Sequence, residues 1–192
     1  MRKPLLLGAL LTTLALAPEP PAGAGTLAGV TLPDKVDVAG QALVLDGMGL
    51  RKVFFIKVYV AGLYLPAKER VAAKVLAADT PRRMAFHFLH GVSAKQMCEA
   101  WEEGLAANTP AAPAEVEAGF RTLCTYMEEI PSGNEMVLTY LPGQGTRVEV
   151  NGKAKGTLPG KPTADAVLAT WIGPRPAPGE DFKRAVLGAA AP

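Results

Sequence analysis

The polar side chains best placed to do chemistry lie in the most apolar part of the sequence. Arg51, Lys57 and Tyr59 belong to a β-branched and aromatic stretch, and on one unbroken strand they would share a face. A guanidinium and a phenol on the inner side of an apolar sheet could hold a carboxylate or a phenolate. Spacing alone equally allows a structural role, in which Arg51 and Lys57 blunt the solvent-exposed end of the strand.

No motif for a phosphate-binding loop, a metal site or a catalytic serine is complete in this sequence. The segment Gly160–Thr163 resembles part of a phosphate-binding loop, but Pro162 interrupts it and the upstream glycine is missing. His87 and His90 are three residues apart on an expected strand, which directs them to opposite faces, and no Cys/His cluster is near. The sequence has no Gly-x-Ser-x-Gly nucleophile elbow. We therefore expect no metal, no other cofactor and no catalytic residue.

The two cysteines, Cys98 and Cys124, lie on consecutive expected helices. The connection from Asn108 to Ala112 is short, so the helices should be antiparallel neighbours. Counted from that connection, the cysteines lie at nearly the same level and on the apolar side of each helix. We expect a disulfide between them. The alternative is two buried free thiols.

The N-terminus has the pattern of an export signal. Arg2 and Lys3 precede an apolar run from Leu5 to Ala17, and a small-x-small cleavage site ends at Ala24. The run is too short to span a bilayer, although an uncleaved membrane anchor is the alternative. We expect a signal peptide over residues 1–24 and a periplasmic or secreted mature protein without a membrane span.

Length and charge limit the remaining possibilities. The chain of 192 residues allows one good core, which we assign to a single domain over residues 25–192. Its formal net charge is only +2, and its basic residues are scattered. This distribution excludes a nucleic-acid partner and provides no overall electrostatic attraction to an anionic membrane.

Periodicity predicts strands, then helices, then strands and two final helices. A loosely patterned segment at 25–41, with a short strand near Val30, precedes them. The expected strands are 42–45, 53–65, 82–90, 135–141, 147–150 and 153–157. The expected helices are 69–77, one capped by Ser93 and ending at Asn108, one opening at Pro113 and stopped by Pro131, 163–172 and 180–187. The order indicates an α+β fold, an antiparallel β-sheet with a layer of helices on one face.

Several segments resemble the chalcone isomerase family, and in particular its exported bacterial members. The most specific are Gly47-Met48-Gly49-Leu50-Arg51-Lys52 and the following strand that ends in Gly62-Leu63-Tyr64-Leu65. The likeness resumes at Glu128–Gly133 and at Ala166–Gly173, so it spans nearly all of the expected mature chain.

The resemblance implies a fold and a kind of site. The family fold is an antiparallel sheet backed by helices. Plant members close a chalcone into a flavanone with an arginine that holds the phenolate, while non-catalytic members bind fatty acids through the same arginine. Arg51 matches that arginine. Tyr59 falls on a threonine of the plant enzymes, and Thr170 falls on a threonine that contacts substrate.

Two departures from the plant enzymes argue against catalysis. Their helical tyrosine and asparagine correspond to Ala94 and Trp101, so the tyrosine that organises the catalytic water is missing. We expect a non-catalytic protein that binds a small apolar carboxylate such as a fatty acid. Arg51 should face a pocket lined by Phe55, Trp101 and Ile172, near Tyr59. An intramolecular lyase and a ligand-free envelope protein remain alternatives, and the sequence leaves the ligand and the oligomeric state open.

Overall fold

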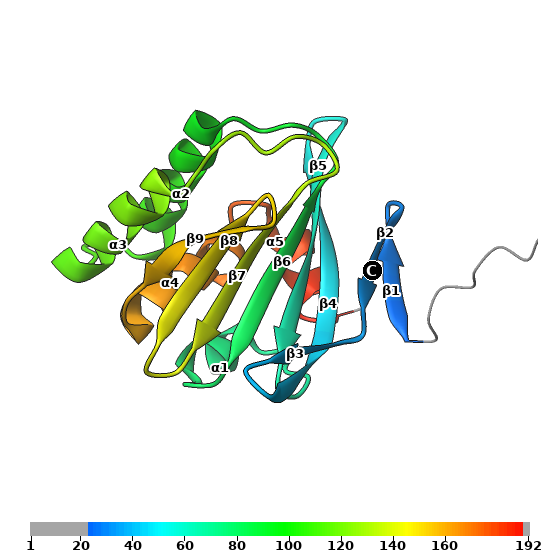
Figure 1. Ribbon diagram of the computed structural model, residues 1–192, viewed down its shortest axis with the longest axis horizontal. Coiled ribbons are helices and arrows are strands. Elements are labelled where there is room, and N and C mark those ends of the chain that lie inside the picture. The colour runs from blue at the N-terminus through cyan, green and yellow to red at the C-terminus, as the bar shows by residue number, and fades with distance from the viewer. Residues whose placement is uncertain (1–22, 190–192) are drawn as a thin grey trace, which may run out of the picture.

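The computed structural model describes residues 23–189, which are built around one curled antiparallel sheet (Figure 1). Its strands follow one another in chain order, so each pairs with its neighbour in the sequence. The strands are β3 (Lys35–Val38), β4 (Gln41–Val53), β5 (Ile56–Leu65), β6 (Arg82–Phe88), β7 (Glu135–Leu141), β8 (Gly145–Val150) and β9 (Lys153–Leu158). The expected α+β class with an antiparallel sheet is confirmed.

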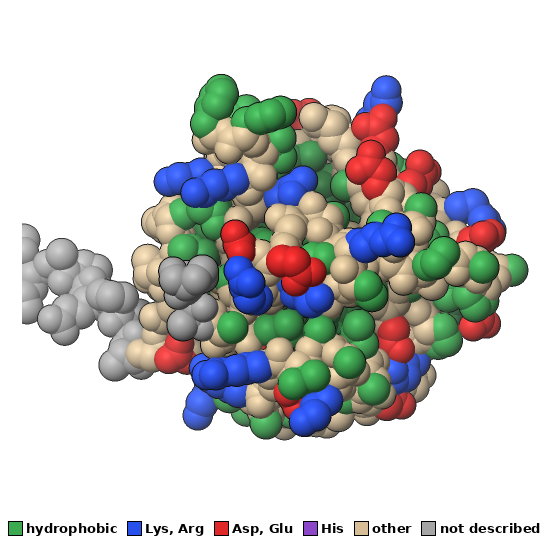
Figure 2. Space-filling model, turned by 180° about the vertical axis from the view of Figure 1, so that it is seen from behind, with side chains coloured by type: hydrophobic (Ala, Val, Ile, Leu, Met, Phe, Trp, Pro, Cys, Tyr) green, Lys and Arg blue, Asp and Glu red, His purple; other side chains and the backbone are tan. Residues whose placement is uncertain are grey.

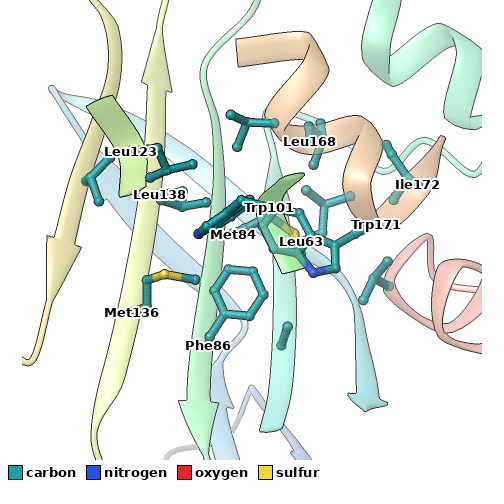
Figure 3. Packing of buried hydrophobic residues seen from close by; sticks show 14 of the residues in the cluster. Leu63, Met84, Phe86, Trp101, Leu123, Met136, Leu138, Leu168, Trp171 and Ile172 are labelled. Carbon is teal, nitrogen blue, oxygen red and sulfur yellow. The ribbon is translucent and has the colours of Figure 1, made fainter. Parts of the chain in front are cut away.

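Helices cover one face of this sheet (Figure 1). They are α1 (Ala72–Ala77), α2 (Ala94–Asn108), α3 (Ala114–Thr125), α4 (Lys161–Ile172) and α5 (Glu180–Val186). Helix α4 is almost entirely buried because it lies between the sheet and the other helices, which accounts for its weakly amphipathic sequence. Between the layers, Phe86 of β6 points toward Trp101 of α2 and Trp171 of α4 (Figure 3).

The expected helical pair is present, but the second helix, α3, ends at Thr125, well before the Pro131 expected to stop it. Ser93 and Gln96 form the predicted capping box at the start of α2. Helices α2 and α3 pack against each other, and Cys98 and Cys124 are joined by a disulfide with their Cα atoms 5.1 Å apart. That separation lies within the usual range for a disulfide.

The segment at residues 25–41 contains more strand structure than expected. Instead of one short strand near Val30, it forms β1 (Ala24–Leu27), β2 (Val30–Pro33) and β3. The β1–β2 hairpin packs on the face of the sheet opposite the helices, where Val30 and Leu32 join a second apolar cluster. Glycine at position 62 permits this packing, because a Cβ there would lie 2.6 Å from a Leu32 methyl group.

The strand expected over residues 53–65 is present from Ile56 to Leu65, but its expected beginning is wrong. Strand β4 runs through Asp46 and Gly47 to Val53, and the chain reverses at Phe54 and Phe55 before β5. Asp46-Gly47 had the composition of a turn. Gly47 is instead a strand residue against which the backbone of α5 packs, with no room for a Cβ.

The expected signal peptide is almost entirely outside the described residues. Ala24, the last residue of that segment, is the first residue of β1 and pairs with Pro33. In residues 23–189, no helix is long and apolar enough to cross a membrane.

Candidate functional site

A cavity of about 310 Å³ lies between strands β4–β6 and helices α2 and α4. Aromatic side chains form its inner part, where Phe86, Trp101 and Trp171 are each less than 5% exposed. Its outer part is bordered by Val53 and Ile56, which are 39% and 38% exposed. The lining residues are Arg51, Val53, Ile56, Val58, Tyr59, Phe86, Phe88, His90, Gly91, Val92, Gln96, Met97, Ala100, Trp101, Met136, Thr170, Trp171 and Ala177.

Arg51 is half-buried near the end of β4 and lines this cavity. It lies directly across from Tyr59 on β5, next to a bulge at which Val58 has no partner on β4. The Arg51 guanidinium donates one hydrogen bond, 2.7 Å long, to the carbonyl oxygen of Ala177 in the α4–α5 loop. That loop is tied back to α4 because the Ala177 N–H donates to the carbonyl oxygen of Thr170. The guanidinium is thus held at the cavity, and among residues 23–189 most of its N–H donors have no acceptor.

Tyr59 is packed among aromatic rings. Its ring centroid is 5.3 Å from that of Phe86 and 5.6 Å from that of Phe88. The indole N–H of Trp171 donates to the phenol oxygen over 3.1 Å. Burial raises the pKa of Tyr59 to about 12, although the Trp171 hydrogen bond and the nearby charge of Arg51 act in the opposite direction. Tyr59 is a neutral phenol at physiological pH with or without this shift, and among residues 23–189 its own O–H has no acceptor.

Trp101 and Thr170 complete the predicted set. The Trp101 ring meets that of Trp171 nearly at right angles, with centroids 5.1 Å apart. Within the described part of the chain, neither the indole N–H of Trp101 nor the hydroxyl of Thr170 has a hydrogen-bond partner, although both atoms are buried. Unpartnered buried polar atoms cost free energy, so a ligand that satisfied either of them would gain affinity.

The structure thus brings the four predicted residues, Arg51, Tyr59, Trp101 and Thr170, to one cavity. Two other expectations about this site are wrong. Phe55 is 92% exposed on the hairpin turn, because β4 and β5 are separate strands. Ile172 is buried but does not line the cavity.

Lys57 does not lie on the same face as Arg51 and Tyr59, as one unbroken strand would require. The turn and the bulge place it opposite Lys52, where it is exposed to solvent. Sequence reasoning also missed Trp171 as a site residue. Its indole N–H holds Tyr59 and its ring lines the cavity. Its position beside Thr170 in a segment that resembles the family was an available signal.

The described residues contain one group with the composition of a metal site, Cys98, Glu102 and Cys124. It lies outside the cavity lining. The two cysteine sulfurs are bonded to each other, so neither is a thiolate that could coordinate a metal.

Comparison with known proteins identifies the protein family. The family model for chalcone isomerase-like proteins matches residues 24–188, and the chain belongs to that family. Among curated proteins, none matches the chain.

A solved structure with a similar fold is that of an Arabidopsis thaliana fatty-acid binding protein, with a TM-score of 0.65 and 17% sequence identity. The match covers 86% of this chain and 96% of the plant protein. At this identity, the likeness establishes the fold.

Proposed function

We propose that this protein binds a small apolar carboxylate, such as a fatty acid, without catalysing a reaction. The apolar tail would occupy the cavity beside Trp101 and Trp171, and the carboxylate would pair with Arg51. The proposal rests mainly on the composition of the cavity wall, which is mostly apolar and, among residues 23–189, includes the guanidinium of Arg51 but no acidic residue. Its volume is at the lower end of the range of about 300–1,000 Å³ typical of ligand pockets.

The second polar group at this site also favours an anion. Tyr59 lies directly across the strand pair from Arg51, and its phenol, like any tyrosine of ordinary or raised pKa, keeps its proton at physiological pH. A neutral phenol can donate a hydrogen bond to a carboxylate, whereas a phenolate would repel it. Arg51 and Tyr59 together could therefore bind both the charge and the lone pairs of the ligand.

Three further observations support this proposal over the alternatives. The Arabidopsis neighbour of the same fold is named as a fatty-acid binding protein. The Trp101 indole lines the cavity, at a position where the sequence resemblance places an asparagine in the plant enzymes. Ala94, which stands where they have the tyrosine that organises water, cannot act as an acid or a base.

We also propose that the protein is exported to the periplasm or secreted. The N-terminal pattern and cleavage site support this location. The disulfide between Cys98 and Cys124 is consistent with it, because such bonds persist in oxidising compartments.

The binding proposal is tested by the variant Arg51→Ala. We expect its affinity for a medium-chain fatty acid to fall by about 1.5–3 kcal/mol, the usual contribution of a hydrogen bond to a charged group. Isothermal titration calorimetry would measure the loss, and circular dichroism would verify folding. The matched control is Arg175→Ala, which removes an exposed arginine from the α4–α5 loop without touching the cavity lining. Equal affinity of Arg51→Ala and the wild type would contradict the proposal.

A further inference from the structure

The turn between β4 and β5 carries a continuous exposed apolar surface. Phe54 and Phe55 are 93% and 92% exposed, and they are flanked by the partly exposed Val53 and Ile56. We call these four residues the hairpin tip. Figure 2 shows apolar side chains gathered at the end of this hairpin, at the top left of the molecule. Single exposed apolar residues are common on soluble proteins, but a projecting group of this kind indicates an interaction site.

The backbone of the hairpin tip is also unusual. Phe54 has a φ of +53°, the left-handed region that aromatic residues rarely adopt. Two-residue hairpin turns that need such a conformation favour glycine, asparagine or aspartate. This sequence instead places two phenylalanines at the turn, where they gain no contact with the core. Strained residues of this kind occur at functional positions more often than elsewhere.

Two lysines lie at the base of the hairpin tip. Lys52 and Lys57 are exposed and directly opposite each other on β4 and β5. Like charges in this arrangement repel, and neither lysine forms an ion pair with any of residues 23–189. An external anion would relieve the repulsion.

The hairpin tip borders the mouth of the cavity. Val53 and Ile56 contribute to the cavity lining, and Arg51 lies two residues before Val53. An apolar projection, a pair of cations and the entrance of an apolar cavity are thus contiguous. A lipid surface presents a layer of anionic headgroups above acyl chains. This arrangement matches an apolar projection that has two lysines at its base.

We infer that the hairpin tip docks the protein on a lipid surface that contains anionic headgroups. Phe54 and Phe55 insert among the acyl chains, while Lys52 and Lys57 contact the phosphates. The low net charge of the chain does not oppose this, because surface attraction acts locally and falls off within a Debye length. A second copy of the chain fits less well, because a symmetric contact between two hairpin tips would bring the two lysine pairs together.

Docking itself requires no ligand in the cavity. Only its consequence, that an apolar carboxylate enters the cavity from the lipid, rests on the proposed function. The two are therefore separable by experiment.

Co-sedimentation with phosphatidylglycerol/phosphatidylcholine vesicles tests the inference, using protein purified after export with its N-terminus read by mass spectrometry. We expect the wild type to bind and Phe54→Ser/Phe55→Ser to bind about tenfold more weakly, because it loses most of the inserted apolar area. Lys52→Glu/Lys57→Glu should also lose binding. Pure phosphatidylcholine vesicles, or salt near 1 M, where the Debye length is about 3 Å, should weaken wild-type binding.

Matched controls are available away from the hairpin tip, since Lys35 pairs with Val44 and Val44 with Leu65, at the other end of β4 and β5 (Figure 1). Lys35→Glu/Lys68→Glu makes the same change in net charge at two exposed lysines, and Val71→Ser removes another exposed apolar side chain. Both should bind vesicles like the wild type. Absence of wild-type binding, or equal binding by the variants of the hairpin tip, would overturn the inference. Self-association that depends on Phe54 and Phe55, without vesicle binding, would overturn it in favour of a second copy.

Fatty-acid affinity in solution, measured without vesicles, separates this inference from the proposed function. Phe54→Ser/Phe55→Ser should retain that affinity, since neither side chain lines the cavity. Vesicle binding without fatty-acid binding would leave docking intact and refute the proposed function. Fatty-acid binding without vesicle binding would leave the proposed function intact and refute docking.

Discussion

Arg51 and Tyr59 are the two polar groups that lie opposite each other at the cavity, and each is held by a different contact. The Arg51 guanidinium uses one donor to hold the α4–α5 loop at Ala177. Burial raises the pKa of the Tyr59 phenol from 10.0 to about 12, and Trp171 donates to its oxygen. The pair therefore presents a positive charge and a neutral donor to the same cavity.

The pKa of Tyr59 has a measurable consequence. Its pKa is raised from 10.0 in the unfolded chain to about 12 in the folded state, so the folded state is more stable while the phenol is protonated. This contribution to the free energy of unfolding is fully present below pH 10 and is lost as the pH rises toward 12. We expect the free energy of unfolding to fall over this window and to fall less in Tyr59→Phe. Urea unfolding at several pH values would measure the difference. Phenolate absorbance of native Tyr59 appearing near pH 10 would show that burial does not act as described.

The side chains at two helical positions predict the absence of chalcone isomerase activity. Ala94 offers no proton donor, and Trp101 offers only an indole N–H. We expect no cyclisation of chalcones above the spontaneous rate when absorbance is followed with excess protein. A saturable rate that disappears in Arg51→Ala would instead establish an intramolecular lyase.

Among the elements, those with local signals were predictable from the sequence. The capping box of Ser93 and Gln96 marks the start of α2, and the Asn151-Gly152 turn marks the β8–β9 hairpin. The β4–β5 turn was not predictable, because Phe54-Phe55 reads as strand and its positive φ has no sequence signal. Asp46-Gly47 was misleading for the opposite reason, since that glycine serves close packing against α5.

The disulfide stabilises the packing of α3 against α2, the helix that contributes Gln96, Met97 and Trp101 to the cavity lining. It links α2 to α3 across a sequence separation of 26 residues. Restricting a loop of this length in the unfolded chain contributes roughly 3 kcal/mol. We expect the denatured, unreduced protein to show no free thiol in a thiol titration, and reduction to lower the free energy of unfolding by about that amount. Detection of two free thiols would exclude the bond.

Across the whole molecule, the two ends of the sheet have different roles. At one end, Arg82 is buried and pairs with Asp165 of α4 at 2.5 Å, while the Tyr140 hydroxyl donates to Asp79. Arg82 also donates to the carbonyl oxygen of Val75 in α1, so this polar network ties α1 and α4 to the sheet. The cavity and the hairpin tip lie at the other end, so the network supports the fold without occupying the ligand site.

The site was partly predictable from the sequence. Arg51, Tyr59, Trp101 and Thr170 were selected on motifs, and all four line one cavity. Phe55 and Ile172 were selected by assuming an unbroken strand and an inward helix face. Which side chains border a cavity depends on the bulge at Val58 and on helix rotation, and neither is encoded by local periodicity.

The most direct test of ligand binding at Arg51 is a crystal structure of the protein with a medium-chain fatty acid. We predict a carboxylate oxygen within about 2.7–3.2 Å of the Arg51 guanidinium, and the acyl chain between Trp101 and Phe86. Tyr59 should donate to the same carboxylate. A fatty acid bound outside this cavity, or bound with its carboxylate away from Arg51, would contradict the account.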